Sequence, residues 1–226
     1  MYEDYFQYTP QEKMKEFYLN EIATLGNPRT FKKNEQIPYF KSSKLAVILK
    51  GRVKVCIYTK SGLEKILFFL NPGEIYGEES LFYPHIEITP VPLEDTIISF
   101  IDNEVLEKYL LKNPLDYRYL FQSILRKYQI SLFQMGDLLK RSPKAQICSA
   151  LYRISIQCNP MSKEELETID VDKYITHEIL GNIIGCSRVT VTRVLNELKK
   201  DGIIDNIGRK IKIIDFKALK ELSEQG

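Results

Sequence analysis

The segment that decides the fold is Ile175-Thr-His-Glu-Ile-Leu-Gly-Asn-Ile-Ile-Gly-Cys-Ser-Arg-Val-Thr-Val-Thr-Arg-Val-Leu-Asn-Glu-Leu198. Its first part carries apolar residues at helical spacing, and Gly185 interrupts that spacing as a left-handed turn residue does. Ser187 is a good cap for a second helix, whose apolar positions are Val191, Val194, Leu195 and Leu198. Two short helices joined by a tight turn form a helix-turn-helix, in which the start of the second helix meets the base edges of DNA.

A predicted hairpin follows the second helix. Lys199-Lys-Asp-Gly202 ends that helix, and residues 203–207 and 210–214 alternate as two strands that turn at Gly208-Arg209. Two ordinary packed helices with solvated arginines would not require this hairpin. The segment is therefore predicted to be a winged helix-turn-helix, with a basic wing tip placed to contact phosphates. Residues 186–212 hold 7 Lys and Arg against 3 Asp and Glu, although the whole chain has a net charge of only +2.

The first half of the chain has a different pattern of apolar and turn residues. A short amphipathic helix is predicted over residues 10–25, and residues 30–101 contain short apolar or alternating runs separated by turn residues. Arg52-Val-Lys-Val-Cys-Ile-Tyr58 alternates with period two, and the pairs Ser61-Gly62 and Pro72-Gly73 mark turns. Regular short strands of this kind predict an antiparallel sandwich or barrel.

A long helix is predicted between these two parts. It begins at Asn113-Pro114, where asparagine can cap and proline suits the first helical position, and it runs to about Leu139. A helix with steps of three and four residues between apolar positions either packs on its own domain or pairs with a copy of itself, and its place after a compact barrel favours pairing. Arg141-Ser142-Pro143 is the predicted hinge. The apolar positions are Leu120, Ile124, Tyr128, Leu132, Met135 and Leu139.

These motifs resemble those of the CRP/FNR superfamily of bacterial transcription regulators. Residues 176–198 resemble the family's helix-turn-helix, while residues 49–55, Ser61-Gly62 and residues 71–82 resemble its cyclic-nucleotide-binding-type jelly roll. The implied fold is α+β, with an effector-sensing antiparallel β jelly roll over residues 1–112, a dimerisation helix over 113–140 and a winged helix-turn-helix DNA-binding domain over 141–226. The resemblance also implies a homodimer, RNA polymerase as a partner, and an effector bound between barrel and helix.

The same resemblance identifies the residues that read double-stranded DNA. Arg193 is the first candidate for a bidentate contact with guanine, whereas Val189 stands where many members have a glutamate that accepts from cytosine. Valine cannot accept a hydrogen bond but can pack on a thymine methyl, so we expect a palindrome with A·T-rich, TTAAT- or TGT-like half-sites. Regulators of anaerobic dehalorespiration carry a similar Val-Thr-Val segment. The predicted DNA-binding residues are Thr176, Ser187, Arg188, Val189, Thr190, Thr192, Arg193 and Arg209.

The effector is predicted to be a small molecule other than cyclic AMP. The family's nucleotide binders place an arginine on the phosphate, after the Gly-Glu that contacts the ribose. Gly77-Glu78 is present, but no arginine occurs between Arg52 and Arg118, and Glu87 in the matching stretch would repel a phosphate. Nearby aromatic residues either belong to the core or line a site for an aromatic or apolar acid. A cyclic-nucleotide-responsive and a redox-controlled or effector-independent regulator are the alternatives. The predicted effector-binding residues are Phe69, Tyr76, Gly77, Glu78, Ser80, Leu81, Thr89 and Tyr128.

Other classes of function find little support in the sequence. It has no Ser/His/Asp set, Gly-rich phosphate loop or metal-ligand spacing, and only 2 His, so we predict no enzyme, metal or cofactor. The 4 Cys include no Cys-x-x-Cys pair and are expected to be reduced thiols. The longest apolar run, residues 66–70, is far shorter than the ~20 residues of a membrane span, and no targeting segment is visible, so a cytoplasmic protein is expected. The winged unit argues against an interaction module that does not bind DNA.

Overall fold

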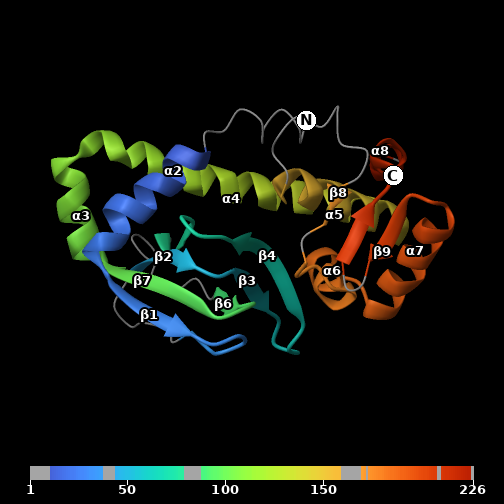
Figure 1. Cartoon of the computed structure of the whole chain (residues 1–226), viewed down its shortest axis with the longest axis horizontal. Helices are drawn as coiled ribbons and strands as arrows, with labels where there is room; N and C mark the ends of the chain where they lie inside the picture. The colour runs from blue at the N-terminus through green and yellow to red at the C-terminus, as the bar shows by residue number, and fades with distance from the viewer. Residues whose placement is uncertain are drawn as a thin grey trace. The chain divides into compact units, whose positions relative to one another are not determined.

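The computed structural model describes residues 11–37, 44–78, 88–158, 169–171, 173–207 and 210–224 (Figure 1). The chain divides into two compact units, one from Pro10 to Ser131 and one that contains Leu132–Gly226. The division falls inside the long helix α4 (Tyr117–Leu138), so each unit includes part of that helix. The predicted boundaries after residues 112 and 140 flank α4 and stay a prediction.

Two antiparallel sheets form the first unit. One has the strand order β1-β7-β2-β5, and the other has the order β4-β3-β6. The predicted antiparallel β-rich domain is confirmed, and the turn at Ser61-Gly62 joins β3 to β4 as expected. The strands are β1 (Asn27–Phe31), β2 (Lys44–Lys50), β3 (Val53–Tyr58), β4 (Glu64–Leu70), β5 (Ile75–Tyr76), β6 (Thr89–Pro92) and β7 (Thr96–Asp102).

Strand β2 is buried on both faces. Leu45 and Val47 join a core formed with the helices, whereas Ala46 and Ile48 join the core that β2 and β7 share with β3 and β4. Successive side chains of a strand point to opposite faces, so a strand covered on both sides must be apolar throughout. This explains why residues 45–49 form a continuous apolar run rather than an alternating one.

Helices cover one face of the β2-containing sheet. The helix predicted over residues 10–25 consists of α2 (Gln11–Phe17), a π turn (Tyr18–Ile22) and a 3-10 turn (Ala23–Leu25). It ends at Gly26, where an added Cβ would lie 2.6 Å from the Phe100 carbonyl oxygen, so the chain can approach β7 only with glycine there. After β7 come α3 (Asn103–Lys112) and a 3-10 turn (Pro114–Asp116), which leads into α4.

Helix α4 contributes to its own unit and also exposes an apolar seam. Leu120 is buried against the helical core, as the first of the two predicted alternatives requires. The exposed seam differs from the prediction at its start, where Phe121 is exposed in place of Leu120, while the predicted Ile124 is exposed together with Leu125. From there the spacing of four and three residues continues through Tyr128, Leu132, Met135 and Leu139, all of them exposed.

The second unit is a set of helices with a small antiparallel sheet. Helix α5 (Pro143–Cys158) begins where Ser142 Oγ accepts a hydrogen bond from the Ala145 amide at 3.1 Å. The predicted wing strands are present as β9 (Ile204–Ile207) and β10 (Lys210–Ile213), and β8 (Ile169–Asp170) pairs with β10 as a third strand. The remaining helices are α6 (His177–Ile184), α7 (Arg188–Lys200) and α8 (Phe216–Glu224).

Buried polar side chains tie the end of α4 to α5 within this second unit. Asp137 accepts from Arg153 Nη2 at 3.0 Å, and the two side chains are only 4% and 3% exposed. The same carboxylate accepts from Ser149 Oγ at 2.5 Å. The last turn of α4 and helix α5 are therefore held together by a buried, hydrogen-bonded ion pair.

Candidate DNA interface and effector site

Side-chain caps set the two helices of the predicted helix-turn-helix. Thr176 Oγ1 accepts from the Ile179 amide at 3.2 Å and so begins α6, while Ser187 Oγ accepts from the Thr190 amide at 3.1 Å and begins α7. Gly185 ends α6 with a φ of 79°, the left-handed conformation that its position predicts. Local chemistry therefore determines where both helices start and where the turn lies.

The turn between the helices is tight because of a second glycine. A Cβ added at Gly181 would lie 2.7 Å from the Cys186 carbonyl oxygen, so a larger residue in α6 would push the turn away. The predicted apolar stripe of α7 is fully buried against the rest of the unit. Its members are Val191, Val194, Leu195 and Leu198.

The opposite face of α7 is open to solvent. Val189 is 79% exposed on this face. Arg188 is exposed as well, and Arg193 Nη1 lies 3.5 Å from Glu197 in a solvent-exposed pair. Such a pair is weak in water, so Arg193 can exchange it for another partner. The structure thus brings Arg188, Val189 and Arg193 together at one exposed helix start.

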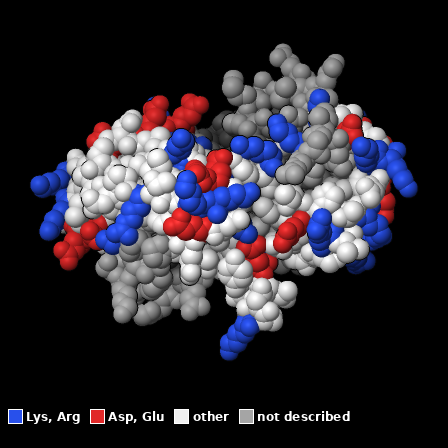
Figure 2. Space-filling view, turned by 60° about the horizontal axis from the view of Figure 1, so that its bottom comes forward, with Lys and Arg blue, Asp and Glu red and all other residues white. Residues whose placement is uncertain are grey.

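Positive charge gathers on this part of the chain. Figure 2 shows Lys and Arg side chains over much of the visible surface, with Asp and Glu side chains among them. The local excess lies in residues 186–212, which hold 7 Lys and Arg against 3 Asp and Glu. Arg209, the predicted wing-tip contact, lies outside the described residues.

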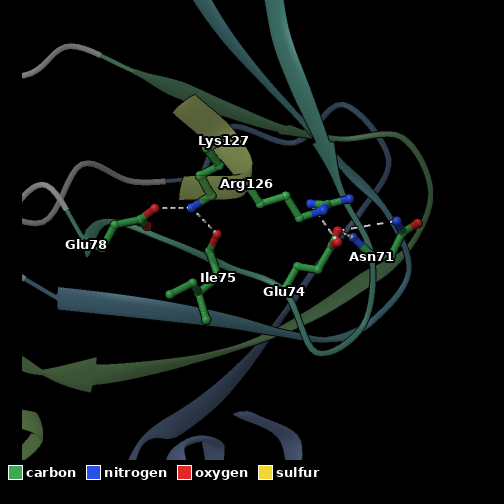
Figure 3. Close-up of polar contacts among 6 residues, drawn as sticks. All are labelled: Asn71, Glu74, Ile75, Glu78, Arg126 and Lys127. Atoms are coloured by element: carbon green, nitrogen blue, oxygen red, sulfur yellow. Dashed lines mark hydrogen bonds and ion pairs between the residues drawn. The ribbon is translucent and has the colours of Figure 1, made fainter. Parts of the chain in front are cut away.

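In the first unit, Lys127 of α4 forms an ion pair with Glu78 (Figure 3). Its ammonium also donates to the Ile75 carbonyl oxygen at 2.7 Å and lies 5.4 Å from the centre of the Phe68 ring. Lys127 and Glu78 are only 12% and 8% exposed. Among the described residues, the second carboxylate oxygen of Glu78 has no hydrogen-bond partner, although it is buried.

The neighbouring residue of α4 makes a parallel contact. Arg126 Nη1 lies 2.9 Å from Glu74, and both side chains are buried. Glu74 also accepts from the Asn71 backbone amide at 2.7 Å, which fixes the turn between β4 and β5. Two consecutive cations of α4 therefore hold the two acidic residues that flank β5 (Figure 3).

Comparison with known proteins identifies the family. Residues 145–222 match the Crp-like helix-turn-helix domain, and residues 28–113 match the cyclic nucleotide-binding domain. The transcriptional regulator SdrP of Thermus thermophilus is 30% identical over 182 residues, which cover 78% of this chain and 82% of SdrP. The chain belongs to the CRP/FNR family of DNA-binding transcription regulators.

Two further proteins are similar to this chain. The cAMP-activated global transcriptional regulator CRP of Salmonella typhimurium is 29% identical over 76% of this chain and 80% of its own length. A solved structure of CprK complexed with OCPA superposes with a TM-score of 0.72 at 24% identity, over 91% of this chain and 93% of CprK. The resemblance stated from the sequence is therefore confirmed, and the similarity to CprK shows the shared fold.

The predicted effector residues of this CRP/FNR regulator fall into separate groups. Tyr76 lies in the core between the sheets, and Gly77 has a φ of 91° with the Lys44 carbonyl oxygen 2.5 Å from an added Cβ. Phe69 is opposite Lys54 in the β3–β4 pair, on the other face of β4 from Phe68, and it lies under the Arg52 guanidinium. Thr89 is half-buried in β6, Tyr128 is exposed on α4, and Ser80 and Leu81 lie outside the described residues.

Sequence reasoning missed Lys127 and Arg126, whereas Phe68 is one of the aromatic residues expected either to belong to the core or to line the effector site. Of the predicted residues, only Glu78 is in the polar cluster with Lys127, which we call the Glu78–Lys127 cluster and define as Ile75, Glu78, Lys127 and Phe68. A lysine beside an apolar helical stripe is expected to be a surface residue, so the spacing of apolar residues could not predict that Lys127 is buried. The sequence feature that could have indicated this burial is the pair of adjacent cations, Arg126-Lys127, in a helix expected to face the barrel.

The described residues include no helix that is long and apolar enough to span a membrane. Within the same residues, no group of three or more His, Cys, Asp or Glu side chains is arranged to hold a metal ion.

Proposed function

We propose that this CRP/FNR regulator binds a palindromic, A·T-rich DNA site as a homodimer and responds to a small organic effector other than cyclic AMP. The observation that carries the effector part is the Glu78–Lys127 cluster. By the resemblance to the family, Glu78 is the residue that would contact a ribose. Here its carboxylate is paired with an internal ammonium, so a nucleotide would have to displace Lys127 without an arginine to neutralise its phosphate.

The chemistry of the cluster favours a hydroxylated aromatic acid. Lys127 can pair with an acidic group, and the Phe68 ring beside it offers an apolar face. The unpartnered oxygen of Glu78 among the described residues can accept from a hydroxyl of the ligand. A ligand with one acidic group, one hydrogen-bond donor and an aromatic ring could contact Lys127, Glu78 and Phe68 respectively.

Cyclic AMP remains the second candidate because Glu78 is present and the relative CRP is cAMP-activated at 29% identity. Titration calorimetry of the full chain with phenols, aromatic acids and cyclic AMP separates the two. We expect saturable heat with a hydroxylated aromatic acid, and its loss in Lys127→Met. Lys54→Met is the matched control, because Lys54 forms a similarly half-buried pair with Glu64 at 2.5 Å outside the cluster. Saturable binding of cyclic AMP alone would overturn the proposed effector class.

DNA recognition is proposed to use the exposed start of α7. In this proposal Arg193 and Arg188 contact guanine, Val189 contacts a thymine methyl, and Arg209 contacts the phosphate backbone. The exposed seam of α4 supports pairing of two chains, which would present two copies of α7 to half-sites one helical turn apart. RNA polymerase is the proposed partner at a bound promoter, and the cytoplasm is the proposed compartment.

Selection of bound DNA from a random pool tests this part. We expect a palindrome with A·T-rich half-sites. Arg193→Ala should lower specific binding by about 1–3 kcal/mol and relax the preference at one base pair in each half-site. Lys217→Ala, on α8 of the same unit, is a control for general loss of positive charge. An unchanged selected site in Arg193→Ala would show that the assignment of readers is wrong.

A further inference from the structure

A chain of hydrogen bonds crosses from α6 to the recognition helix. His177, the first residue of α6, lies with its Nδ1 2.9 Å from the Thr192 hydroxyl oxygen in α7. The same hydroxyl donates to the Arg188 carbonyl oxygen at 2.9 Å. His177 and Thr192 are both half-buried, whereas Arg188 is exposed at the start of α7.

The direction of these bonds follows from the groups involved. A carbonyl oxygen only accepts, so the single hydroxyl proton of Thr192 goes to Arg188. The Thr192 oxygen must then act as the acceptor for His177, which requires a proton on Nδ1 of the imidazole. Both the Nδ1–H neutral ring and the imidazolium satisfy this arrangement.

This arrangement limits what Thr192 can offer to DNA. Its hydroxyl has no proton left for a base, and the oxygen is turned toward the backbone of α7 and toward His177. Because the oxygen and the methyl group are different substituents of the same Cβ, the methyl group points away from these two partners of the oxygen. A guanine or adenine N7 and a thymine O4 require a donor, whereas the thymine methyl packs against another methyl.

We propose that His177 is a positioning residue that sets base preference through Thr192. By holding the hydroxyl away from the DNA, it makes Thr192 a reader of the thymine methyl, and so adds a second A·T-selecting position to that of Val189. This inference rests on the proposed reading face of α7. A histidine that only contacted a phosphate would affect all sequences alike.

The test compares base preference among variants of the full chain by selection from a random pool. In His177→Ala the Thr192 hydroxyl keeps only its bond to the Arg188 carbonyl oxygen and can turn toward a base by giving up that one bond. We expect the preference for A·T at one step to fall about fivefold or more. His177→Asn should keep the preference of the unaltered chain, because the asparagine amide places a donor close to the position of Nδ1. An unchanged preference in His177→Ala, with equal weakening at all sites, would overturn the proposal.

A second pair of variants does not depend on how well His177→Ala folds. Thr192→Val keeps the methyl group and should keep the A·T preference, whereas Thr192→Ser keeps the hydroxyl and should lose it. The reverse result would overturn the role of His177. If the unaltered chain selects no site, the proposed reading face itself is wrong. If it selects a site that both Thr192 variants leave unchanged, only the inference about His177 and Thr192 is wrong.

Discussion

Val189 is a single residue whose side chain has a direct consequence for sequence preference. It is 79% exposed beside Arg188 on the open face of α7, and it has no hydrogen-bonding group. Val189→Glu introduces a carboxylate that can accept a hydrogen bond from the cytosine amino group. We therefore expect the selected base pair at this step to change from A·T to C·G. The variant should favour C·G over A·T by about 1–3 kcal/mol in binding free energy. Sequencing of selected DNA checks this, and an unchanged step would show that Val189 does not face a base.

His177 also predicts a pH dependence of stability. Burial, followed by the charge of Arg188, lowers the pKa of its imidazole below the ordinary 6.5. The folded chain therefore binds this proton less readily than the unfolded chain. The stability that neutral His177 contributes is fully present above pH 6.5 and is lost as the pH falls below 6.5 through the lowered pKa of the folded chain. We expect the free energy of unfolding of the second unit to fall less from about pH 7.5 to about pH 5.5 in His177→Asn than in the unaltered chain. Equal slopes would contradict the lowered pKa.

At the scale of elements, the Glu78–Lys127 cluster joins α4 to β5. Lys127→Met leaves the Glu78 carboxylate buried without its cation, and removal of one partner of a buried pair typically costs about 3–5 kcal/mol. We expect a loss of this order in the unfolding free energy of the first unit, measured by urea denaturation with a probe in that unit. Lys32→Met removes an exposed partner of Asp95 and should change stability little. Equal effects of the two variants would show that the buried pair does not hold α4.

At the scale of the whole molecule, the exposed seam of α4 predicts a dimer. Leu125 lies in the middle of that seam, and Leu63 is similarly exposed in the turn between β3 and β4. A glutamate in a two-helix seam places a charge in a desolvated interface. We therefore expect Leu125→Glu to sediment as a monomer and to bind the palindrome more weakly, whereas Leu63→Glu should remain dimeric. A dimeric Leu125→Glu would place the interface elsewhere.

Much of the architecture was predictable because its signals are local. The helix-turn-helix follows from two caps, Thr176 and Ser187, and from Gly185 between them, and each acts within three or four residues. The wing follows from two alternating runs, whereas β8 was missed because a strand of two residues has no periodicity to detect. The seam of α4 was predicted except for its first residue, because spacing alone does not tell which of Leu120 and Phe121 faces the core.

By itself, the sequence determined the order of the elements, the winged helix-turn-helix and the membership in the CRP/FNR family, because caps, turns and apolar spacing act between near neighbours in the chain. Only the tertiary structure decided which charges and hydroxyls are paired. Lys127 meets Glu78 across 49 residues, and His177 meets Thr192 across 15. Such pairs depend on how helices and strands pack against one another, and packing leaves no periodic mark in the sequence. The proposals about effector and base preference therefore rest on contacts that only the folded chain creates.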